Sequence, residues 1–270
     1  MGGCFLDTTI VIHVSEVSHP DKEKGITFIS SNQPAEMPYY ALKELLNGRV
    51  RILCEAHNAV LAAENHAEAL LALINRSPAE GRKRIGRIED LAKSLERVFN
   101  SNPAGDRKHL KREILQDLAL VTSRLWRNAH RINSVSITQS LACFNDGKLT
   151  YGTAGELRGP QDNFNCKRNE RCSAAAYLYD NKSVLQAMID SLHSKKLESA
   201  LANKNETKQR RRAMKELLSK GPKSFNKRLC RALGDAYFAA MCPSGSTLVT
   251  SNMEDYIPLC HALRKEVKIP

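Results

Sequence analysis

Several common functional signatures are missing from this chain. No apolar run approaches the length of a transmembrane helix, and the apolar stretch at residues 4–12 is too short for a signal peptide and contains Asp7. The eight cysteines include no CxxC pair, and the histidines lack the HExxH spacing of a zinc protease. There is no glycine-rich phosphate loop and no GxSxG motif. We therefore expect a cytoplasmic protein with reduced cysteines.

Charge is nearly absent around two carboxylates. Asp7 is the only formal charge in the first fifteen residues, and Asp235 is the only one between Arg231 and Glu254. Burying an unpaired carboxylate costs on the order of several kcal/mol, so each acid is expected to have a bound cation, another charge or a helix cap as partner. A structural interpretation stays open for both: Asp7 as a cap or turn residue, and Asp235 paired with a buried Arg.

Polar residues also follow a predicted strand near the end of the sequence. Residues 246–250 are typical of a buried strand, and Asn252 and Asp255 come soon after it. Residues 38–48 predict a short helix with Pro in its first turn, Gly just past its end and Glu44 at the border of its apolar stripe. Open parallel α/β sheets build their sites at the carboxyl ends of strands, so this order favours a site of that kind.

Taken in order, these segments resemble the motifs of the PIN-domain nucleases, especially the toxin ribonucleases of bacterial toxin–antitoxin pairs. The segments that carry the resemblance are Phe5-Leu6-Asp7-Thr8-Thr9, residues 41–48 around Glu44, residues 234–240 with Asp235, residues 248–256, and residues 263–269 as a closing edge strand. Asp7 and Glu44 are 37 positions apart, and Asp235 and Asn252 are 17 apart, both in the family's usual range. The resemblance covers about the first fifty and the last fifty residues.

The resemblance implies an α/β fold, in which a PIN-like, mostly parallel central sheet is flanked by helices. It also implies a nuclease site in which acidic residues hold Mg²⁺ or Mn²⁺. The residues predicted to be catalytic and to bind the metal are Asp7, Glu44, Asp235 and Asp255. The residues predicted to orient these ligands or the attacking water are Thr9, Thr250 and Asn252.

Two departures from the family pattern affect this interpretation. Many members have an acid at the position of Asn252, so Asp255 is the best candidate for a fourth acid in this motif, although an amide oxygen can still bind Mg²⁺. Glu44 and Asp235 are 191 positions apart, whereas a compact member needs far fewer. We therefore predict a split catalytic core at residues 1–50 and 223–270, with a basic, mainly helical insert at residues 51–222.

Positive charge is concentrated in the predicted insert. The whole chain carries a formal +12, whereas residues 1–50 carry −2 and residues 232–270 carry −1. Basic clusters lie at residues 81–87, 107–112 and, most densely, 204–231. Such clusters favour phosphate partners, with a solvated helix face as the alternative. The residues predicted to contact nucleic acid are Arg82, Lys83, Arg84, Lys208, Arg210, Arg211, Arg212 and Lys215.

The insert is predicted to be helical because apolar residues recur at helical spacing through much of it. The segments with this pattern are residues 56–74, 85–98 and 110–125, followed by an Ala-rich segment at 173–192. Residues 145–171 are polar, contain Gly and are typical of a long loop or lid. Few aromatic residues lie among the basic ones, which favours recognition of folded RNA by shape over base stacking.

These features predict a metal-dependent endoribonuclease that hydrolyses RNA phosphodiester bonds. An inactive PIN-like nucleic-acid-binding protein is the alternative from another class, and Asn252 supports it. DNA, or a structured RNA such as tRNA or rRNA, also stays open as substrate, because phosphate contacts do not report the sugar. Free ribonuclease activity endangers a cell, so an inhibitory partner protein or a self-inhibiting insert is also expected. A zinc site is a further alternative at Cys166 and Cys172, with His130 and His193 elsewhere.

Overall fold

The computed structural model describes residues 3–15, 20–63, 107–133, 143, 147–159, 172–192, 204–224 and 226–270. The chain divides into two units. Unit 1 comprises Met1–Leu45, Arg127–Asp146 and Asp162–Pro270, and unit 2 comprises Leu46–Trp126 and Gly147–Gln161. No helix in the described ranges is long and apolar enough to cross a membrane.

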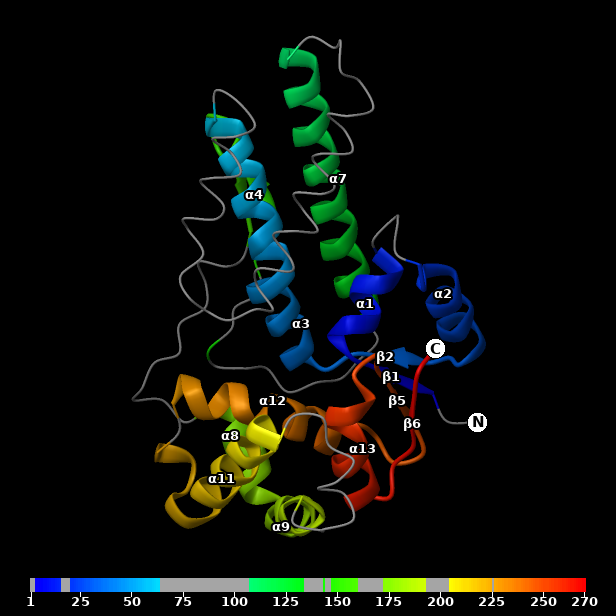
Figure 1. Ribbon diagram of the computed structural model, residues 1–270, viewed down its shortest axis with the longest axis vertical. Coiled ribbons are helices and arrows are strands. Elements are labelled where there is room, and N and C mark those ends of the chain that lie inside the picture. The colour runs from blue at the N-terminus through cyan, green and yellow to red at the C-terminus, as the bar shows by residue number, and fades with distance from the viewer. Residues whose placement is uncertain are drawn as a thin grey trace. The chain divides into compact units, whose positions relative to one another are not determined.

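The sheet of unit 1 has four parallel strands in the order β2-β1-β5-β6 (Figure 1). The strands are β1 (Cys4–Leu6), β2 (Ala35–Glu36), β5 (Thr247–Val249) and β6 (Val267–Lys268). In the register, Phe5 lies opposite Glu36 on β2 and Leu248 on β5. Every residue of β1 is buried, as expected for a strand covered on both faces. The predicted α/β class and the parallel sheet are therefore confirmed.

The helices of unit 1 come from both ends of the sequence. They are α1 (Thr8–Ser15), α2 (Lys22–Ser31), α3 (Tyr39–Leu45), α8 (Ser173–Asp180), α9 (Lys182–Ser191), α11 (Lys204–Lys220), α12 (Lys227–Met241) and α13 (Met253–Ala262), with a short 3-10 turn at Pro222–Ser224. Phe238 of α12 packs between Phe5 of β1 and Tyr256 of α13, with ring centroids 5.0 and 5.7 Å away. These rings join the central strand to α12 and α13, which carry Asp235 and Asp255.

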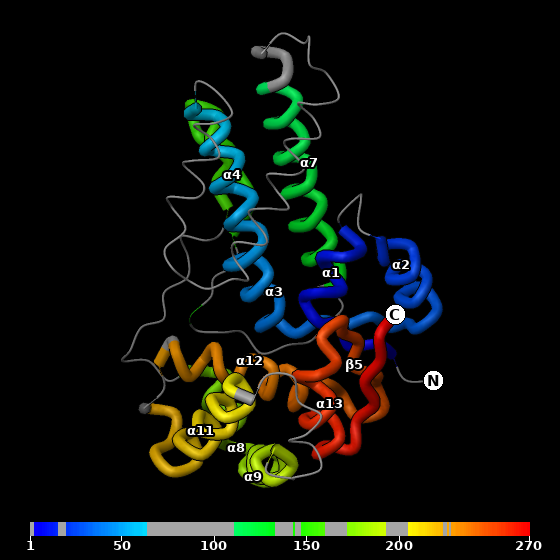
Figure 2. The backbone as a smooth tube through the Cα atoms, viewed as in Figure 1, coloured from blue at the N-terminus to red at the C-terminus, as the bar shows by residue number. Residues whose placement is uncertain are grey.

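The boundary of the predicted insert differs from the division of the structure. Helices α8, α9 and α11 belong to unit 1, where α11 contacts α12 and α9 contacts α13. Figure 2 shows these helices grouped with α12 and α13. Met214 and Leu217 of α11 are completely buried, so this helix forms part of the core of unit 1. Only part of residues 51–222 therefore lies outside that unit.

Unit 2 contains the π-helical turn Leu46–Val50, α4 (Arg51–Ala62), most of α7 (Arg107–Asn133), and the antiparallel strands β3 (Thr150–Tyr151) and β4 (Leu157–Arg158). Asn58 of α4 holds β4 through both backbone groups of Leu157, accepting from its N–H at 2.7 Å and donating to its carbonyl at 3.0 Å. Lys111 of α7 donates to the carbonyls of Leu61 and Ala63 at 2.8 Å each, at the end of α4.

Some local expectations are corrected and others fall outside the described ranges. The helix predicted at residues 38–48 does not end at Gly48, because the helical path continues through the π-helical turn into α4. Gly48 has open space around it and no positive φ, so nothing there diverts the chain. The predicted loop at 145–171 contains the strand pair β3–β4. The predictions that concern residues outside the described ranges are the helix at 85–98, Arg82, Lys83, Arg84, Cys166 and His193.

Candidate active site

Asp7 lies at the carboxyl end of β1, where its backbone N–H donates to the carbonyl of Val249 at 2.9 Å. Its side chain is buried, with 4% exposed, and accepts hydrogen bonds from the first two residues of α1 and from the residue that follows β5. Oδ1 accepts from the Thr8 N–H and Oγ1 at 2.7 and 3.1 Å, and Oδ2 accepts from the hydroxyls of Thr9 and Thr250 at 3.0 and 2.8 Å. The turn role considered for Asp7 is therefore present, together with a contact to the loop after β5.

The predicted supporting residues link the start of α1 to the loop that follows β5. Thr250 is buried and accepts a hydrogen bond at 2.9 Å from the backbone N–H of Asn252. Thr9 accepts one at 3.3 Å from the N–H of Ser251. Since β1 and β5 are neighbouring parallel strands, their carboxyl ends lie at the same edge of the sheet. Thr9 and Thr250 thus fix the orientation of the Asp7 carboxylate.

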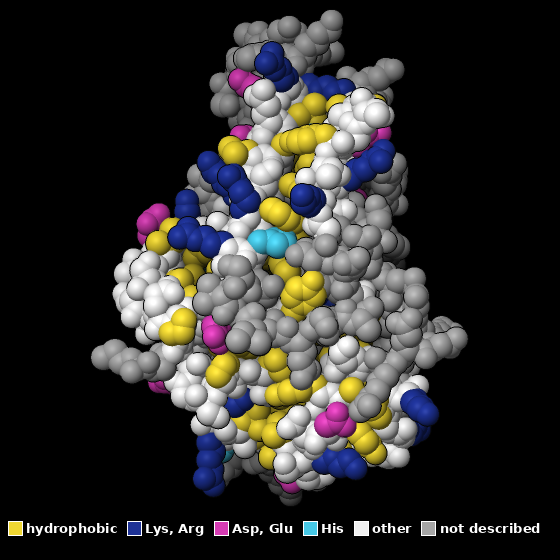
Figure 3. All heavy atoms as spheres, turned by 180° about the vertical axis from the view of Figure 1, so that it is seen from behind, with side chains coloured by type: hydrophobic (Ala, Val, Ile, Leu, Met, Phe, Trp, Pro, Cys, Tyr) yellow, Lys and Arg dark blue, Asp and Glu magenta, His cyan; other side chains and the backbone are white. Residues whose placement is uncertain are grey.

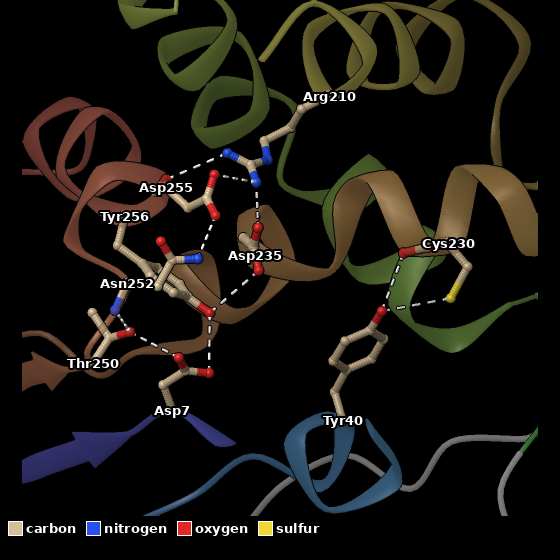
Figure 4. Close-up of polar contacts among 9 residues, drawn as sticks. All are labelled: Asp7, Tyr40, Arg210, Cys230, Asp235, Thr250, Asn252, Asp255 and Tyr256. Atoms are coloured by element: carbon tan, nitrogen blue, oxygen red, sulfur yellow. Dashed lines mark hydrogen bonds and ion pairs between the residues drawn. The ribbon is translucent and has the colours of Figure 1, made fainter. Parts of the chain in front are cut away.

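Tyr256 connects two of the predicted acids (Figure 4). Its hydroxyl lies 3.4 Å from Oδ1 of Asp7 and 3.4 Å from Oδ1 of Asp235, and can donate to either. Burial raises the pKa of Tyr256 well above its ordinary value, and the charges of Asp7, Asp235 and Glu44 add to this effect. The phenol therefore stays protonated and remains a donor. No pattern in the sequence predicted a role for Tyr256.

Arg210 of α11 enters the same site from the side opposite Tyr256 (Figure 4). Its Nη2 donates to Oδ2 of Asp235 and to Oδ1 of Asp255, the latter at 3.1 Å, and Nη1 donates to the backbone carbonyl of Asp255 at 3.4 Å. Only 5% of the residue is exposed. Burial acts to lower the pKa of Arg210, but the charges of Asp235 and Asp255 outweigh it and the pKa is raised. The structural alternative for Asp235, pairing with a buried Arg, is therefore present.

The surroundings of Asp235 shift its pKa in opposite directions. Burial raises its pKa to about 6, the charges of Asp255 and Asp7 act in the same direction, and Arg210 lowers it. The side chain keeps 32% of its surface exposed. The pKa remains high although a guanidinium contacts the carboxylate, so one positive charge does not offset burial and the two neighbouring acids.

The remaining predicted acids lie at the edge of this network. Asp255 is half-buried and also accepts a hydrogen bond from the side-chain amide of Asn252. Glu44 is exposed, and its negative charge contributes to the raised pKa values of Tyr40 and Tyr256. The structure thus brings Asp7, Asp235 and Asp255 into one network and leaves Glu44 at its solvent edge.

The donor types fit Mg²⁺ or Mn²⁺, which prefer oxygen ligands such as the carboxylates of Asp7, Asp235 and Asp255. In the ranges that the structure covers, however, no three His, Cys, Asp or Glu side chains are grouped so that they could hold a metal ion. Two of these carboxylates are instead bridged by Arg210, and Tyr256 lies between Asp7 and Asp235. Metal binding by this set requires the guanidinium to leave.

The predicted nucleic-acid contacts on α11 lie on different faces of the helix. Lys208, Arg212 and Lys215 are exposed, and Arg211 is half-buried. Arg210 cannot contact a phosphate in this arrangement, because it is buried against the acids. The sequence did contain a signal for this difference. Arg210 occurs at helical spacing with the buried Thr207, Ala213, Met214 and Leu217, as residues of the inward face do.

The sequence and the structure of this chain have no counterpart among the known proteins that were compared with it. No family model matches the chain, and comparisons with curated proteins and with solved structures found no significant match. The PIN-like identity of the fold therefore stays a prediction. What the site does is inferred from its own residues.

Proposed function

We propose that this protein is a metal-dependent endoribonuclease with a PIN-like core that hydrolyses phosphodiester bonds in RNA. One observation carries the proposal: a single hydroxyl, that of Tyr256, joins two acids from opposite ends of the sequence at the carboxyl end of a parallel sheet. Asp255 joins the same network through Arg210. Sites in open parallel α/β sheets form at this edge.

A structural ion pair alone does not account for the number of acids. Arg210 needs one carboxylate as partner, whereas the network contains Asp7, Asp235 and Asp255. Like charges that lie close together repel by several kcal/mol per pair at an effective dielectric of about 20. A divalent cation would relieve that repulsion. Excess acid at one site therefore favours a metal-binding role over a purely structural one.

Each residue has a role in this proposal. Asp7, Asp235 and Asp255 would bind Mg²⁺ or Mn²⁺, and Glu44 would act from the solvent edge through water. The bound ion would lower the pKa of a water molecule and stabilise the leaving oxygen. Thr9 and Thr250 already hold the carboxylate of Asp7 in one orientation.

Basic residues outside the acidic site support a polyanionic substrate. Lys208, Arg212 and Lys215 are exposed on α11. In unit 2, the exposed Arg112 lines a pocket of about 340 Å³ together with His57 and the 63% exposed Tyr151, among others. Figure 3 shows Lys and Arg side chains, together with some Asp and Glu side chains, among uncharged ones in the view that it draws. Distributed cations of this kind suit contacts with a phosphate backbone.

Two contacts favour the second candidate, an inactive nucleic-acid-binding protein. Arg210 neutralises part of the acidic charge, and Asn252 stands where many PIN-domain nucleases have an acid and donates to Asp255. In that case the acids would be satisfied from within the chain and would bind no metal. The two candidates differ in whether the protein cleaves RNA.

Cleavage of labelled RNA with and without Mg²⁺ or Mn²⁺ tests the proposal. Wild type should cleave only with metal, and Asp7→Asn or Asp235→Asn should lower the rate by about a hundredfold or more, because each removes a carboxylate ligand. RNA binding by these variants should be unchanged or stronger, since negative charge near the phosphates is lost. Glu254→Gln is the matched control, because Glu254 is an exposed acid beside Asp255 on α13.

The outcomes separate the candidates. Cleavage that persists in a chelator would contradict a metal-dependent mechanism. Binding of RNA and DNA without cleavage of either, at every metal concentration, would favour the inactive binding protein. Cleavage of DNA in place of RNA would contradict RNA as the substrate but would support metal-dependent hydrolysis of phosphodiester bonds.

A further inference from the structure

Arg210 contacts two of the proposed metal ligands at once. We propose that its guanidinium takes the place of a divalent cation between Asp235 and Asp255, so that the site is closed to metal until α11 releases this side chain. The inference concerns regulation of the site and rests on the proposed function, because it takes these carboxylates to be metal ligands. The controlling element would be part of the same chain.

The contacts match those expected of a substitute cation. One nitrogen, Nη2, donates to a carboxylate oxygen of Asp235 and to one of Asp255, and Nη1 reaches the backbone carbonyl of Asp255. A bridging metal ion would use the same carboxylates. The Arg210 side chain is more than nine-tenths buried, with 6% exposed, whereas Asp235 keeps 32% of its side chain exposed. Arg210 and a metal ion therefore cannot occupy the site together.

The guanidinium is nevertheless an incomplete partner for the site. Its Nε is buried and has no hydrogen-bond partner within the described ranges. An unsatisfied buried N–H is costly, so part of the favourable energy of the two ion pairs is offset. Its single positive charge contacts two acids, Asp235 and Asp255, and the Tyr256 hydroxyl links Asp235 to a third, Asp7. A dication supplies twice the charge and leaves no unsatisfied donor, so exchange of one for the other is chemically reasonable.

Helix α11 provides the means of release. Arg210 projects from its buried face, along with Thr207, Met214 and Leu217. The opposite face carries the exposed Lys208, Arg212 and Lys215. A shift of this helix would withdraw the guanidinium from both carboxylates in one movement, while Asp7, Asp235 and Asp255 stay on β1, α12 and α13. Movement of α11 alone would therefore release Arg210 from both carboxylates.

The test is the affinity of the protein for Mn²⁺, measured by titration calorimetry without RNA. Arg210→Gln should bind Mn²⁺ about tenfold more tightly than wild type or better, because the competing cation is gone. Arg212→Gln removes the same charge from the exposed face of the same helix and should bind as wild type does. Circular dichroism establishes that both variants fold. Equal affinity of the two variants would overturn the inference.

A second measurement uses only the wild-type protein and so does not depend on the folding of a variant. Saturating Mn²⁺ should expel Arg210 and speed amide hydrogen exchange across α11 (Lys204–Lys220), while α13, which stays in place, should exchange as before or more slowly. Unchanged exchange in α11 at saturating Mn²⁺ would contradict release of the helix.

Failure of the inference and failure of the proposed function give different results. If Arg210→Gln gains affinity for Mn²⁺ and no variant cleaves RNA, the inference holds and the nuclease proposal fails. If wild type cleaves RNA with metal and Arg210→Gln gains no affinity, the nuclease proposal holds and the inference fails.

Discussion

Asp235 combines burial, one cation and two neighbouring acids, and its titration should be visible in the stability of the protein. Its pKa is raised from the ordinary value of 3.8 to about 6. Between about pH 4 and pH 6 the folded chain therefore keeps a proton that the unfolded chain has lost, so this group's contribution to stability is complete below about pH 4 and is lost as pH rises to 6. Asp235→Asn stays neutral throughout.

The measurement is urea unfolding of wild type and Asp235→Asn from about pH 4 to pH 8, with a chelator present. The free energy of unfolding of the variant should rise relative to wild type between about pH 4 and 6 and then stay level. Asp117→Asn, which changes an exposed acid on α7, should give a difference that does not depend on pH in this window. A flat difference for Asp235→Asn would show that its pKa is not raised.

At the residue scale, the site could be predicted in part. Asp7 and Asp235 were found because a charge in an apolar run needs a partner, and both lie in the same network. Tyr256 could not be found that way, because an aromatic residue in an apolar helix is as typical of a packed core as of a site. Arg210 was grouped with Arg211 and Arg212 as a charge run, although its spacing with buried residues indicated the inward face.

Helix α12 packs closely against α3 at Gly234. A Cβ added there would lie 2.9 Å from the hydroxyl oxygen of Tyr40 and 3.3 Å from its ring, and that hydroxyl donates to the carbonyl of Cys230 at 3.1 Å. Gly234→Ala should lower the free energy of unfolding by about 1 to 2 kcal/mol. Overpacking costs about 1 to 3 kcal/mol, and the better helix propensity of Ala returns up to about 1 kcal/mol. Thermal and urea unfolding measure the change.

A double-mutant cycle separates the clash from other effects. Tyr40→Phe removes the oxygen that the new methyl group would meet. Gly234→Ala should therefore cost less stability in the Tyr40→Phe background than in wild type. If Gly234→Ala is as stable as wild type, Tyr40 moves aside without loss and the packing of α3 on α12 is looser than described.

At the element scale, local patterns predicted some elements and missed others. The apolar run around Leu248 predicted β5 in the right place, because a buried parallel strand is apolar on both faces. The strand pair β3–β4, in contrast, lies in a segment that was predicted to be a loop. The predicted insert includes α11 because this helix looks like a solvated basic helix in sequence, whereas the structure groups it with unit 1. Its membership in unit 1 depends on contacts with α12 and on the buried Arg210, which join distant parts of the chain.

For the whole molecule, the salt dependence of RNA binding reports how many phosphates the basic residues contact. Replacing Lys208, Arg212 and Lys215 with Ala should weaken binding to many RNA sequences alike and flatten the plot of log affinity against log salt by up to about 0.7 to 0.9 per lost contact. Arg210 is left in place, since it pairs with the acids. Affinity is measured at several salt concentrations.

The control for this experiment removes the same number of exposed cations elsewhere. Lys24, Lys148 and Lys268 are exposed and lie outside the three basic clusters, so their replacement with Ala should leave the slope close to that of wild type. Equal slopes for wild type and the α11 variant would mean that the outward face of α11 is simply solvated.

The two faces of α11 have a thermodynamic consequence. On this helix of 17 residues, three basic side chains point outward, those of Lys208, Arg212 and Lys215, and Arg210 points inward. A polyanion bound to the outward face and the acids bound to Arg210 therefore both influence the position of the same helix. A ligand that favours the withdrawn position lowers the free energy needed to admit a metal ion. By linkage, the ion then raises the affinity for that ligand by the same factor. Substrate and metal would thus bind cooperatively through the position of α11, in addition to any contact at the cleaved bond.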